Sequence, residues 1–473
     1  MPHRHLAWFV FVPLFVIALS VWSFQTPPPE SDYKRMYAIA DVLAEVDKSY
    51  YRELTNEEKQ AMIEAMIKGG MRSLDPYSEY FNETDLKQFT SDNRGVFGGI
   101  GAMLDVDIKK GRLIVDAPMP DSPAMEAGLM AKDEILKVDG EAVNPADPDA
   151  SRGRIKGEPG TKVTLNIQRG EKNFDITITR AVIQVHAVKG FRKSRTDPKA
   201  WDYMLDAESG VAMIRLAEFS EKSFTEVQTA LKAIDDAGAK ALILDMRNNG
   251  GGLLNMAEKI SDLFLADGVI VQTKDRYDLG KVTKANRDGT PWEDAKKRPL
   301  AVLQNGASAS ATEIVAAALQ DNNRAVIVGE RSYGKGSVQR SIIAGDEKSG
   351  LKLTTQIWLT PNGRHIDKGI ILTRKEREDT TRDKEDFGVK PDDGYEVKLS
   401  EAEMIQYFLH LREVDRGREP RQAPKPTTKP AKNELPDIDP DYRDPVVEKA
   451  LDYLKNALKD GQKAQLKRTL EPS

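Results

Sequence analysis

The chain has 473 residues, of which 40% are hydrophobic and 31% are charged, and its formal net charge is -5. A chain of this length exceeds one hydrophobic core and should fold as about two to four domains. The near balance of charge gives no reason to expect a nucleic acid as a partner. The sequence has no cysteine, which excludes disulfides, thiolate metal sites and cysteine nucleophiles.

The N-terminus is strongly apolar. A run from Leu6 to Phe24 follows a short stretch that carries Arg4. The run exceeds the hydrophobic region of a cleaved signal, about 7–15 residues, and it ends in bulky side chains rather than at a small-x-small cleavage site. It approaches the ~20 residues that span a bilayer. Residues 1–25 are therefore predicted to be an uncleaved signal-anchor, with a cleaved signal as the alternative, and the rest of the chain to be exported.

Residues 26–92 are predicted to form an N-terminal helical region. Three consecutive prolines indicate a stiff stalk, and two amphipathic helices follow it. Their apolar stripes consist of Ile39, Val42, Leu43 and Val46, and of Met62, Ile63, Met66 and Ile67. These stripes are suited either to capping a core or to pairing with a second subunit. The second of these alternatives predicts a homo-oligomer, which is expected here.

Residues 93–186 change to short alternating strands separated by Gly and Asp turns, which is typical of a small barrel or sandwich. Strands are predicted at 103–108, 112–117, 135–140, 162–167 and 174–179, and a short helix within 122–129.

Residues 187–418 have an α/β pattern. Strands are predicted at 211–216, 241–245, 299–304 and 325–329, and helices over 224–237, over 253–265 and after Ser310. Such alternation predicts a layered sheet with loops at the strand ends. The charged insert 374–386 should be an exposed excursion.

The C-terminal part begins with a proline-rich linker at 419–445. A C-terminal helix is predicted at 446–473, with Asp444 as its N-cap and Pro445 in its first turn.

A serine stands at the turn between a predicted strand and a helix in NGASASATEIVAAAL (305–319). Ser310 and Glu313 fit the Ser-x-x-Glu pattern of a helix capping box. The same position lies before unpaired backbone N–H groups and the positive end of a helix dipole, which suits both a nucleophile and an oxyanion. The pattern leaves a structural cap and a catalytic serine both open for Ser310, and Ser308 is a neighbour that shapes the strand end.

A catalytic serine requires a base, and the chain has only five histidines. His365 lies near a loop of the α/β region, so a Ser–His–Asp triad is one hypothesis. The favoured candidate is Lys335 in SYGKGSVQ (332–339), which lies between Gly334 and Gly336. Burial would lower the pKa of such a lysine and let it act as a base. A lysine in a surface turn is the structural alternative.

A glycine-rich loop, RNNGGG (247–252), follows the predicted strand 241–245. Glycines at a strand end can present backbone N–H groups to a reacting carbonyl. The loop fits neither a P-loop nor the GxGxxG pattern, and no cofactor or metal is expected.

Together these motifs resemble the carboxyl-terminal processing proteases, also called tail-specific proteases, from about residue 35 to 400 and again at DPVVEKALDYL. The segments are SLDPYSEYF (73–81), GGIGAML (98–104), SPAMEAGLMAKDEILKVDG (122–140), LDMRNNGGGLL (244–254), NGASASATEI (305–314) and GERSYGKGSVQ (329–339). The last three in combination are highly specific. The resemblance implies a multidomain α+β chain with N-terminal helices, a PDZ-like β-rich domain at 93–186, a ClpP/crotonase-like α/β protease core at 187–418 and a C-terminal helix.

The resemblance also implies roles for individual residues. The family's nucleophile is the second serine of the Ser-Ala-Ser pair and its base is a lysine, which correspond to Ser310 and Lys335 at the family's spacing. An assisting glutamine corresponds to Gln339, which would orient Lys335. The implied oxyanion donors are the N–H groups of Ala311 and of Gly251 or Gly252.

A PDZ-like domain implies a way of recognising substrate. PDZ domains bind an extended C-terminus as an added strand and hold its carboxylate with the N–H groups of a Gly-rich loop. The corresponding residues are Gly98, Gly99, Ile100, Gly101, Ala102 and Met103. Apolar Ile100 and Met103 favour hydrophobic C-terminal residues, and in this family such domains can also gate the protease.

The function that the resemblance implies is a serine endopeptidase that cleaves exported proteins near their C-termini. Expected partners are proteins with exposed apolar C-termini, the membrane through the anchor, further copies of the chain and, if substrates are delivered, an adaptor protein. The expected location is the periplasmic side of a bacterial inner membrane or the cell surface, with a cleaved and secreted form as the lesser option. The alternatives are a non-catalytic PDZ scaffold with an inactive protease domain and a crotonase-like protein that binds an acyl thioester.

Four features depart from the family pattern. Thr312 stands where serine is often found, Gly250 replaces a common proline, and Lys132 replaces the glycine of a PDZ turn. The charged insert is the fourth. None removes a catalytic residue, so an active enzyme is expected.

Overall fold

The computed structural model describes residues 30–107, 112–119, 121–145, 147–197, 199–286, 292, 298–345, 347–369, 386–418 and 438–470. The chain forms two compact units that divide after Gly70. The anchor predicted at 6–24, most of the charged insert and most of the proline-rich linker lie outside the described residues. Among the residues that are described, no helix has both the length and the hydrophobicity needed to cross a membrane.

The first unit consists of the two predicted amphipathic helices, α2 (Glu30–Ser49) and α3 (Asn56–Arg72), the second of which ends just beyond the division. A capping box starts α3, because Thr55 N–H donates to Glu58 Oε2 at 2.9 Å and Glu58 N–H donates to Thr55 Oγ1 at 3.2 Å. The apolar stripes stay largely uncovered, with exposed Ile39, Val42, Ile63, Met66 and Ile67. The two helices therefore bury little apolar surface of their own.

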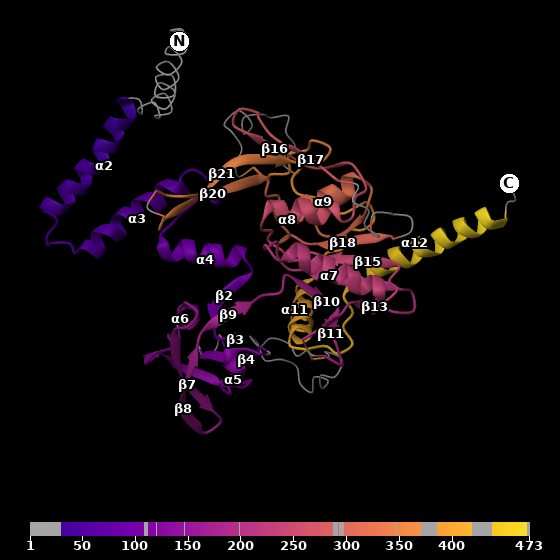
Figure 1. Ribbon diagram of the computed structural model, residues 1–473, viewed down its shortest axis with the longest axis horizontal. Coiled ribbons are helices and arrows are strands. Elements are labelled where there is room, and N and C mark those ends of the chain that lie inside the picture. The colour runs from indigo at the N-terminus through magenta and orange to yellow at the C-terminus, as the bar shows by residue number, and fades with distance from the viewer. Residues whose placement is uncertain are drawn as a thin grey trace, which may run out of the picture. The chain divides into compact units, whose positions relative to one another are not determined.

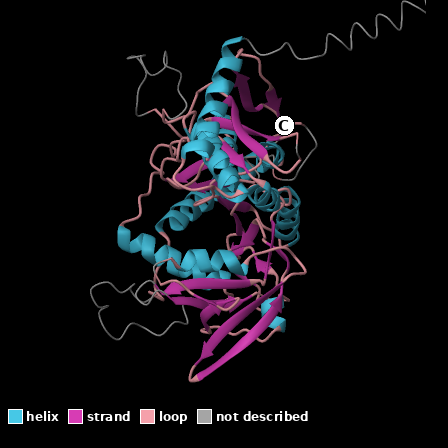
Figure 2. Ribbon diagram, turned by 90° about the vertical axis from the view of Figure 1, so that its left-hand side faces the viewer, coloured by secondary structure: helices cyan, strands magenta, loops and turns pink. Residues whose placement is uncertain are grey.

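The second unit begins with β1 (Glu79–Phe81) and α4 (Glu83–Asn93), which lead into a β-rich domain. In that domain β2 (Val96–Gly99) pairs with β9 (Ala181–Gln184). A larger antiparallel sheet has the order β3 (Ala102–Asp107), β4 (Arg112–Pro118), β5 (Glu134–Val138), β7 (Lys162–Arg169) and β8 (Lys172–Thr179), with β6 (Glu141–Ala142) beside β5. Two short helices, α5 (Pro123–Glu126) and α6 (Pro148–Ile155), complete it. Figure 2 shows in magenta how strands dominate this domain.

The β-rich domain has its own core, formed by alternate strand residues such as Leu113, Val115, Ile135 and Leu165. All five predicted strands and the short helix are present. Lys132 adopts φ 74°, the left-handed conformation for which glycine is preferred. The departure noted in the sequence thus places a side chain on a backbone turn that still has the glycine-like geometry.

The α/β domain is built on a sheet with the order β10 (Val188–Gly190), β14 (Val211–Leu216), β15 (Ala241–Asp245), β18 (Leu300–Gln304) and β19 (Val326–Gly329). The last four strands are parallel, while β10 and the short β13 (Met204–Asp206) run antiparallel to β14. Helices α7 (Ser223–Asp236), α8 (Leu254–Asp262) and α9 (Ala311–Asp321) connect the parallel strands (Figure 1). The predicted alternation of strands and helices is confirmed.

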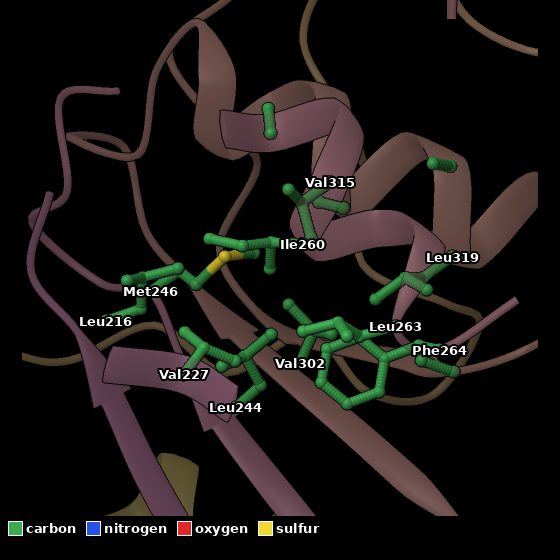
Figure 3. Close-up of a cluster of buried hydrophobic side chains, with 14 of the residues drawn as sticks. Leu216, Val227, Leu244, Met246, Ile260, Leu263, Phe264, Val302, Val315 and Leu319 are labelled. Atoms are coloured by element: carbon green, nitrogen blue, oxygen red, sulfur yellow. The ribbon is translucent and has the colours of Figure 1, made fainter. Parts of the chain in front are cut away.

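Helices cover both faces of this sheet. On one face Leu244 and Val302 pack against α8 and α9, and Figure 3 shows them beneath Ile260 and Val315. On the other face Ile243, the neighbour of Leu244, packs with residues of α12 (Pro445–Leu470). Both faces are therefore buried, which explains why these strands read as continuous apolar runs.

A second sheet has the order β1, β21 (Gly350–Leu359), β16 (Val269–Asp275) and β17 (Val282–Lys284), and β20 (Ser337–Ile343) pairs with β21. Helix α11 (Glu401–Asp415) follows later in the chain, and β11 (Arg192–Lys193) pairs with β12 (Trp201–Asp202). The sequence had not indicated β20, β21 or α11. Because β15, β18 and β19 are parallel neighbours, the loops that follow them emerge at one edge of the central sheet. These are the loops that carry the predicted site, and the multidomain α+β fold class is confirmed.

Candidate active site

Ser310 is the N-cap of α9, directly after the loop that follows β18. Its backbone has φ 59° and ψ -116°, a strained conformation for a residue with a side chain, which costs about 1–3 kcal/mol. Ser308 is completely buried; its Oγ donates to Met246 O at 2.9 Å and accepts from Asn305 N–H at 3.0 Å. Ser308 therefore shapes the strand end, and Ser310, half-buried, is the more accessible of the two serines.

The carboxylate of Glu313 joins the loop after β18 to the loop after β19. Its Oε2 accepts from the N–H groups of Ser310, at 2.7 Å, and Lys335, at 2.9 Å. Its Oε1 accepts from Ser332 Oγ–H at 2.5 Å and Gly334 N–H at 2.6 Å. Burial raises the pKa of Glu313 above its ordinary value, and these hydrogen bonds oppose that rise because they stabilise the charged form. One buried oxygen atom thus holds the backbones of both predicted catalytic residues.

Lys335 lies in a crowded loop. Added Cβ atoms at its glycine neighbours would clash, at 2.9 Å from Phe387 for Gly334 and at 2.8 Å from His365 Nε2 for Gly336. Burial and then the positive charge of Lys352 lower the pKa of Lys335 to about 8, against the opposing pull of Glu313 and Asp75. Lys335 is half-buried, and this lowering of its pKa has the direction expected of a lysine that acts as a base.

The amino group of Lys335 lies 4.8 Å from the centroid of the Tyr77 ring. Among the described residues it makes no hydrogen bond to Ser310 or Gln339. Catalytic hydrogen bonds are often long in ligand-free proteins and tighten only when substrate binds. A rotation of this long side chain would be needed to bring Nζ to the serine hydroxyl.

Gln339 lies on β20, where its Nε2 donates to Ser337 Oγ at 2.9 Å and to Thr354 Oγ1 at 3.1 Å. Thr354 is on the neighbouring strand β21, and Thr354 Oγ1 donates in turn to Asp75 at 3.2 Å. Sequence reasoning identified Gln339 but neither of the residues beyond it. The segment that contains Asp75 had been noted only as part of the family resemblance.

The loop 247–252 packs closely against Ser310 at Gly251. A Cβ at Gly251 would lie 2.8 Å from Ser310 Cβ and 2.9 Å from Ala311 N. Gly251 N–H donates to Asn249 Oδ1 at 2.9 Å, whereas the N–H groups of Gly252 and Ala311 have no hydrogen-bond partner among the described residues. Two of these three N–H groups therefore remain unengaged among the described residues, and the third is used within the loop.

Asn249 anchors this loop to the strand and helix around it. It is completely buried; its Nδ2 donates to Leu216 O at 2.8 Å, and its carbonyl accepts from Ala309 N–H at 3.0 Å and Thr312 Oγ1–H at 2.9 Å. Threonine at position 312 keeps the hydroxyl that serine would supply there. Sequence reasoning missed Asn249, although it lies within the quoted motif.

A buried pair of salt bridges holds the first residue of the same loop, Arg247. Arg247 pairs with Asp245 at 2.7 Å and with Asp444 at 2.8 Å, and its guanidinium lies 4.4 Å from the centroid of the Tyr407 ring. Asp444 also accepts from Val446 N–H at 3.0 Å, so the predicted N-cap of α12 is confirmed. The start of the C-terminal helix is thereby tied to the loop beside Ser310.

The β-rich domain contains a small cavity of about 150 Å³ beside β3. It is lined by Phe97, Gly99, Ile100, Gly101, Ala102, Leu104, Arg152, Ile155 and Lys156. Gly98 and Gly99 belong to β2, so the connecting loop is shorter than the glycine run suggested. Met103 does not line the cavity, because successive side chains of a strand point to opposite faces. One edge of β3 is unpaired within the described residues, as an added strand would require.

Two family models match the chain: Peptidase family S41 over residues 210–374 and PDZ domain over residues 114–169. A carboxy-terminal-processing protease of Bartonella bacilliformis is 35% identical over 421 residues, which cover 86% of this chain and 88% of that protein. Carboxy-terminal processing protease CtpA of Bacillus subtilis is 35% identical over 324 residues, or 68% and 64% of the two chains. Among solved structures, the photosystem II D1 C-terminal processing protease covers 76% of this chain and 86% of its own at 25% identity, with a TM-score of 0.41.

Substitution of Glu313 by glutamine tests the role of the buried carboxylate. The NH₂ group of glutamine cannot accept hydrogen bonds, so those of the four donors that face it would lose their acceptor. Each buried donor left without a partner should destabilise the folded protein by about 1–3 kcal/mol. We expect a lower unfolding temperature in calorimetry and faster hydrogen exchange of the α9 amides. Glu396→Gln, at an exposed ion pair, is the matched control and should leave both unchanged. Equal protection of α9 in the two variants would contradict the role given to Glu313.

Proposed function

Because the chain belongs to the carboxy-terminal processing proteases of peptidase family S41, we propose that it is a serine endopeptidase that cleaves exported proteins near their C-termini. In this proposal Ser310 is the nucleophile, Lys335 is the general base and Gln339 assists the lysine. The PDZ domain recognises the substrate C-terminus and gates access to the active site.

The observation that carries the proposal is the shared hydrogen-bond acceptor of Ser310 and Lys335. Both backbone N–H groups donate to Glu313 Oε2, so these two residues, which follow different strands, are held as neighbours. A lysine with a pKa lowered to about 8 is substantially neutral at mildly alkaline pH and can take a proton from a hydroxyl. Serine and lysine at this junction therefore support acyl transfer.

The reaction begins when Ser310 Oγ attacks the scissile carbonyl while its proton passes to Lys335 Nζ. The negative charge on the carbonyl oxygen is stabilised by the N–H groups of Ala311 and Gly252, which are unengaged among the described residues. Lys335 then gives the proton to the leaving amine, and an acyl-enzyme remains. Water attacks the ester with Lys335 again as the base, which restores Ser310.

Substrate selection follows from the geometry of the PDZ domain. An extended apolar C-terminus would add to the free edge of β3, and its last side chain would enter the cavity of about 150 Å³. Its carboxylate would accept from the N–H groups of the loop at Ile100 and Gly101. This part of the proposal predicts a preference for apolar C-terminal residues.

Export and assembly are parts of the same proposal. The apolar run from Leu6 to Phe24 would anchor the chain in a bacterial inner membrane with the protease on the periplasmic side, or at the cell surface. The exposed apolar stripes of α2 and α3 would be covered by further copies of the chain, and an adaptor would bring substrates to the PDZ domain. The fraction released from membranes by alkaline carbonate, and light scattering of the purified protein, test these points.

Replacement of the nucleophile is the decisive experiment. Ser310→Ala should abolish cleavage of casein and of a peptide with an apolar C-terminus, and Lys335→Arg should do the same because arginine stays charged. His365→Ala separates the two candidate bases and should retain activity. Cleavage by Ser310→Ala at the wild-type rate would refute the proposal and favour a non-catalytic PDZ scaffold.

The lowered pKa of Lys335 predicts a pH dependence. Neutral lysine is the active form, so kcat/KM should rise as pH increases through about 8 and then level off. Lys352→Gln removes a positive charge that disfavours protonation of Lys335, so the pKa of Lys335 should rise. The pH range over which activity increases should therefore move to higher pH. Lys348→Gln removes the same charge from an exposed site and should leave the profile in place. Superimposable profiles for wild type and Lys352→Gln would argue against Lys335 as the titrating base.

Two adjacent glycines test the close approach of the oxyanion loop. A Cβ at Gly251 would collide with Ser310 Cβ, and its φ of 101° disfavours any side chain, whereas a Cβ at Gly250 meets nothing within 4 Å. Gly251→Ala should therefore push the loop away from Ser310, displace the neighbouring Gly252 N–H and reduce kcat by about 10²–10³-fold, the usual effect of losing an oxyanion donor. Gly250→Ala should stay close to wild type. Equal kcat values for the two variants would show that the loop does not contact the reacting centre as proposed.

A further inference from the structure

The segment SLDPYSEYF holds a carboxylate whose hydrogen bonds are almost all local. Asp75 Oδ1 accepts from the N–H groups of Tyr77, at 2.8 Å, and Ser78, at 2.9 Å, and Oδ2 accepts from Ser78 Oγ–H at 2.7 Å. These bonds form an Asx-turn immediately before β1. A turn of this kind orients the carboxylate rigidly, and one further hydrogen bond leaves the turn.

That hydrogen bond comes from Thr354 on β21, whose Oγ1 donates to Asp75 Oδ1 at 3.2 Å. The backbone strengthens the contact, because Thr354 N–H donates to Ser78 Oγ at 3.1 Å. Asp75 is therefore fixed to the middle of β21 by two bonds that run in the same direction, from Thr354 to the turn.

A β-bulge brings Gln339 opposite Thr354. In the pairing of β20 with β21, Val338 faces Gln356 but Gln339 faces Thr354, so Thr355 is passed over. A one-residue shift in register moves side chains to the other face of a sheet. The bulge thus places the amide of Gln339 beside the hydroxyl of Thr354, where Nε2 donates to Oγ1 at 3.1 Å.

The direction of these bonds fixes the orientation of the Gln339 amide. A carboxylate can only accept, so the hydroxyl hydrogen of Thr354 is committed to Asp75 and its oxygen can only accept from Gln339. The NH₂ group must therefore face Thr354, and its second hydrogen goes to Ser337 Oγ at 2.9 Å. Both amide hydrogens are then used, and Oε1 is the remaining polar atom of the side chain.

We propose that Asp75 and Thr354 are positioning residues that orient the Gln339 amide so that Oε1, rather than NH₂, faces Lys335. The inference rests on the proposed function, in which Lys335 is the base. Lys335 Nζ lies over the ring of Tyr77, whose N–H donates to Asp75, and Asp75 accepts from the Thr354 hydroxyl that holds Gln339. One turn therefore contacts the lysine and also the hydrogen bonds that reach the glutamine. The turn before β1 thereby acts on the catalytic residues without touching substrate.

The orientation matters because the lysine changes from amine to ammonium during the reaction. An amide oxygen accepts a hydrogen bond from Nζ–H and stabilises the ammonium that forms when Ser310 loses its proton. An amide turned the other way would point its NH₂ hydrogens at the lone pair on Nζ of neutral Lys335. That lone pair must stay free to receive the proton from Ser310. A free Thr354 hydroxyl could donate to Oε1 and favour this wrong orientation, and the Asp75 carboxylate prevents it.

Three substitutions at neighbouring threonines test the proposal. Thr354→Val keeps the shape but removes the hydroxyl, and it should lower kcat by about ten- to a hundredfold with KM within about twofold, because a misoriented amide forfeits only part of the roughly 10²–10⁴-fold that general-base catalysis contributes. Thr354→Ser restores the hydroxyl and should recover most of kcat. Thr355→Val is the matched control one residue away and should behave as wild type. Circular dichroism and melting curves establish that each variant is folded.

The remaining variants separate orientation from a general structural effect. Asp75→Asn should reduce kcat as Thr354→Val does, and in a Gln339→Ala background Thr354→Val should cause no further loss, because the amide it orients is gone. The proposal is overturned if Thr354→Val matches Thr355→Val, if Thr354→Ser is as impaired as Thr354→Val, or if the two losses multiply in the double variant. Ser310→Ala distinguishes the two levels of the argument, since activity that survives it refutes the proposed function itself.

Discussion

The arrangement of the whole site depends on one buried carboxylate. Glu313 lies in the first turn of α9, completely enclosed, and a charge in that position is tolerated only when hydrogen bonds replace the water it has lost. Its donors come from the cap of its own helix and from the loop after the neighbouring strand β19. The fold must therefore bring the two loops together in order to bury the glutamate at all. The proximity of Ser310 and Lys335 follows from this requirement.

The same principle operates a layer deeper, where Arg247 is shared between Asp245 and Asp444. Removing one partner from such a buried group leaves an unpaired charge, and this destabilises the folded protein far more than the loss of an exposed ion pair would. Asp444 also begins α12, whose apolar face covers the sheet on the side opposite α9. The C-terminal helix thus supports the edge of the sheet that carries Ser310 through an ion pair as well as through packing of the core.

Sequence reasoning predicted the features that have a local signal. Continuous apolar runs predicted β14, β15, β18 and β19, and the serine–glutamate spacing predicted the cap of α9. The same reasoning overlooked β20 and β21, because most of their mixed polar and apolar residues are half-buried or exposed and their pairing is interrupted by a bulge. It could not find the contact of Asp75 with Thr354, since the two residues are far apart in the chain and meet only through pairing between strands. A capping box indicated that Glu313 accepts from its own helix, but nothing local indicated that it also receives Lys335.

The loop 247–252 is restrained by contacts other than those of the residue at position 250. A proline there would restrict the backbone, but Gly250 occupies open space at the outermost point of the loop, and its φ lies outside the left-handed region. Hydrogen bonds restrain the loop on both sides of this position. Asn248 exchanges two hydrogen bonds with Asn305, and Asn249 makes buried contacts with β14 and α9. After it, Phe219 pairs with Gly252 on the far side of the loop. Because side-chain and backbone hydrogen bonds fix both ends, the loss of proline stiffness at the tip changes the entropy of the unfolded chain more than the geometry beside Ser310.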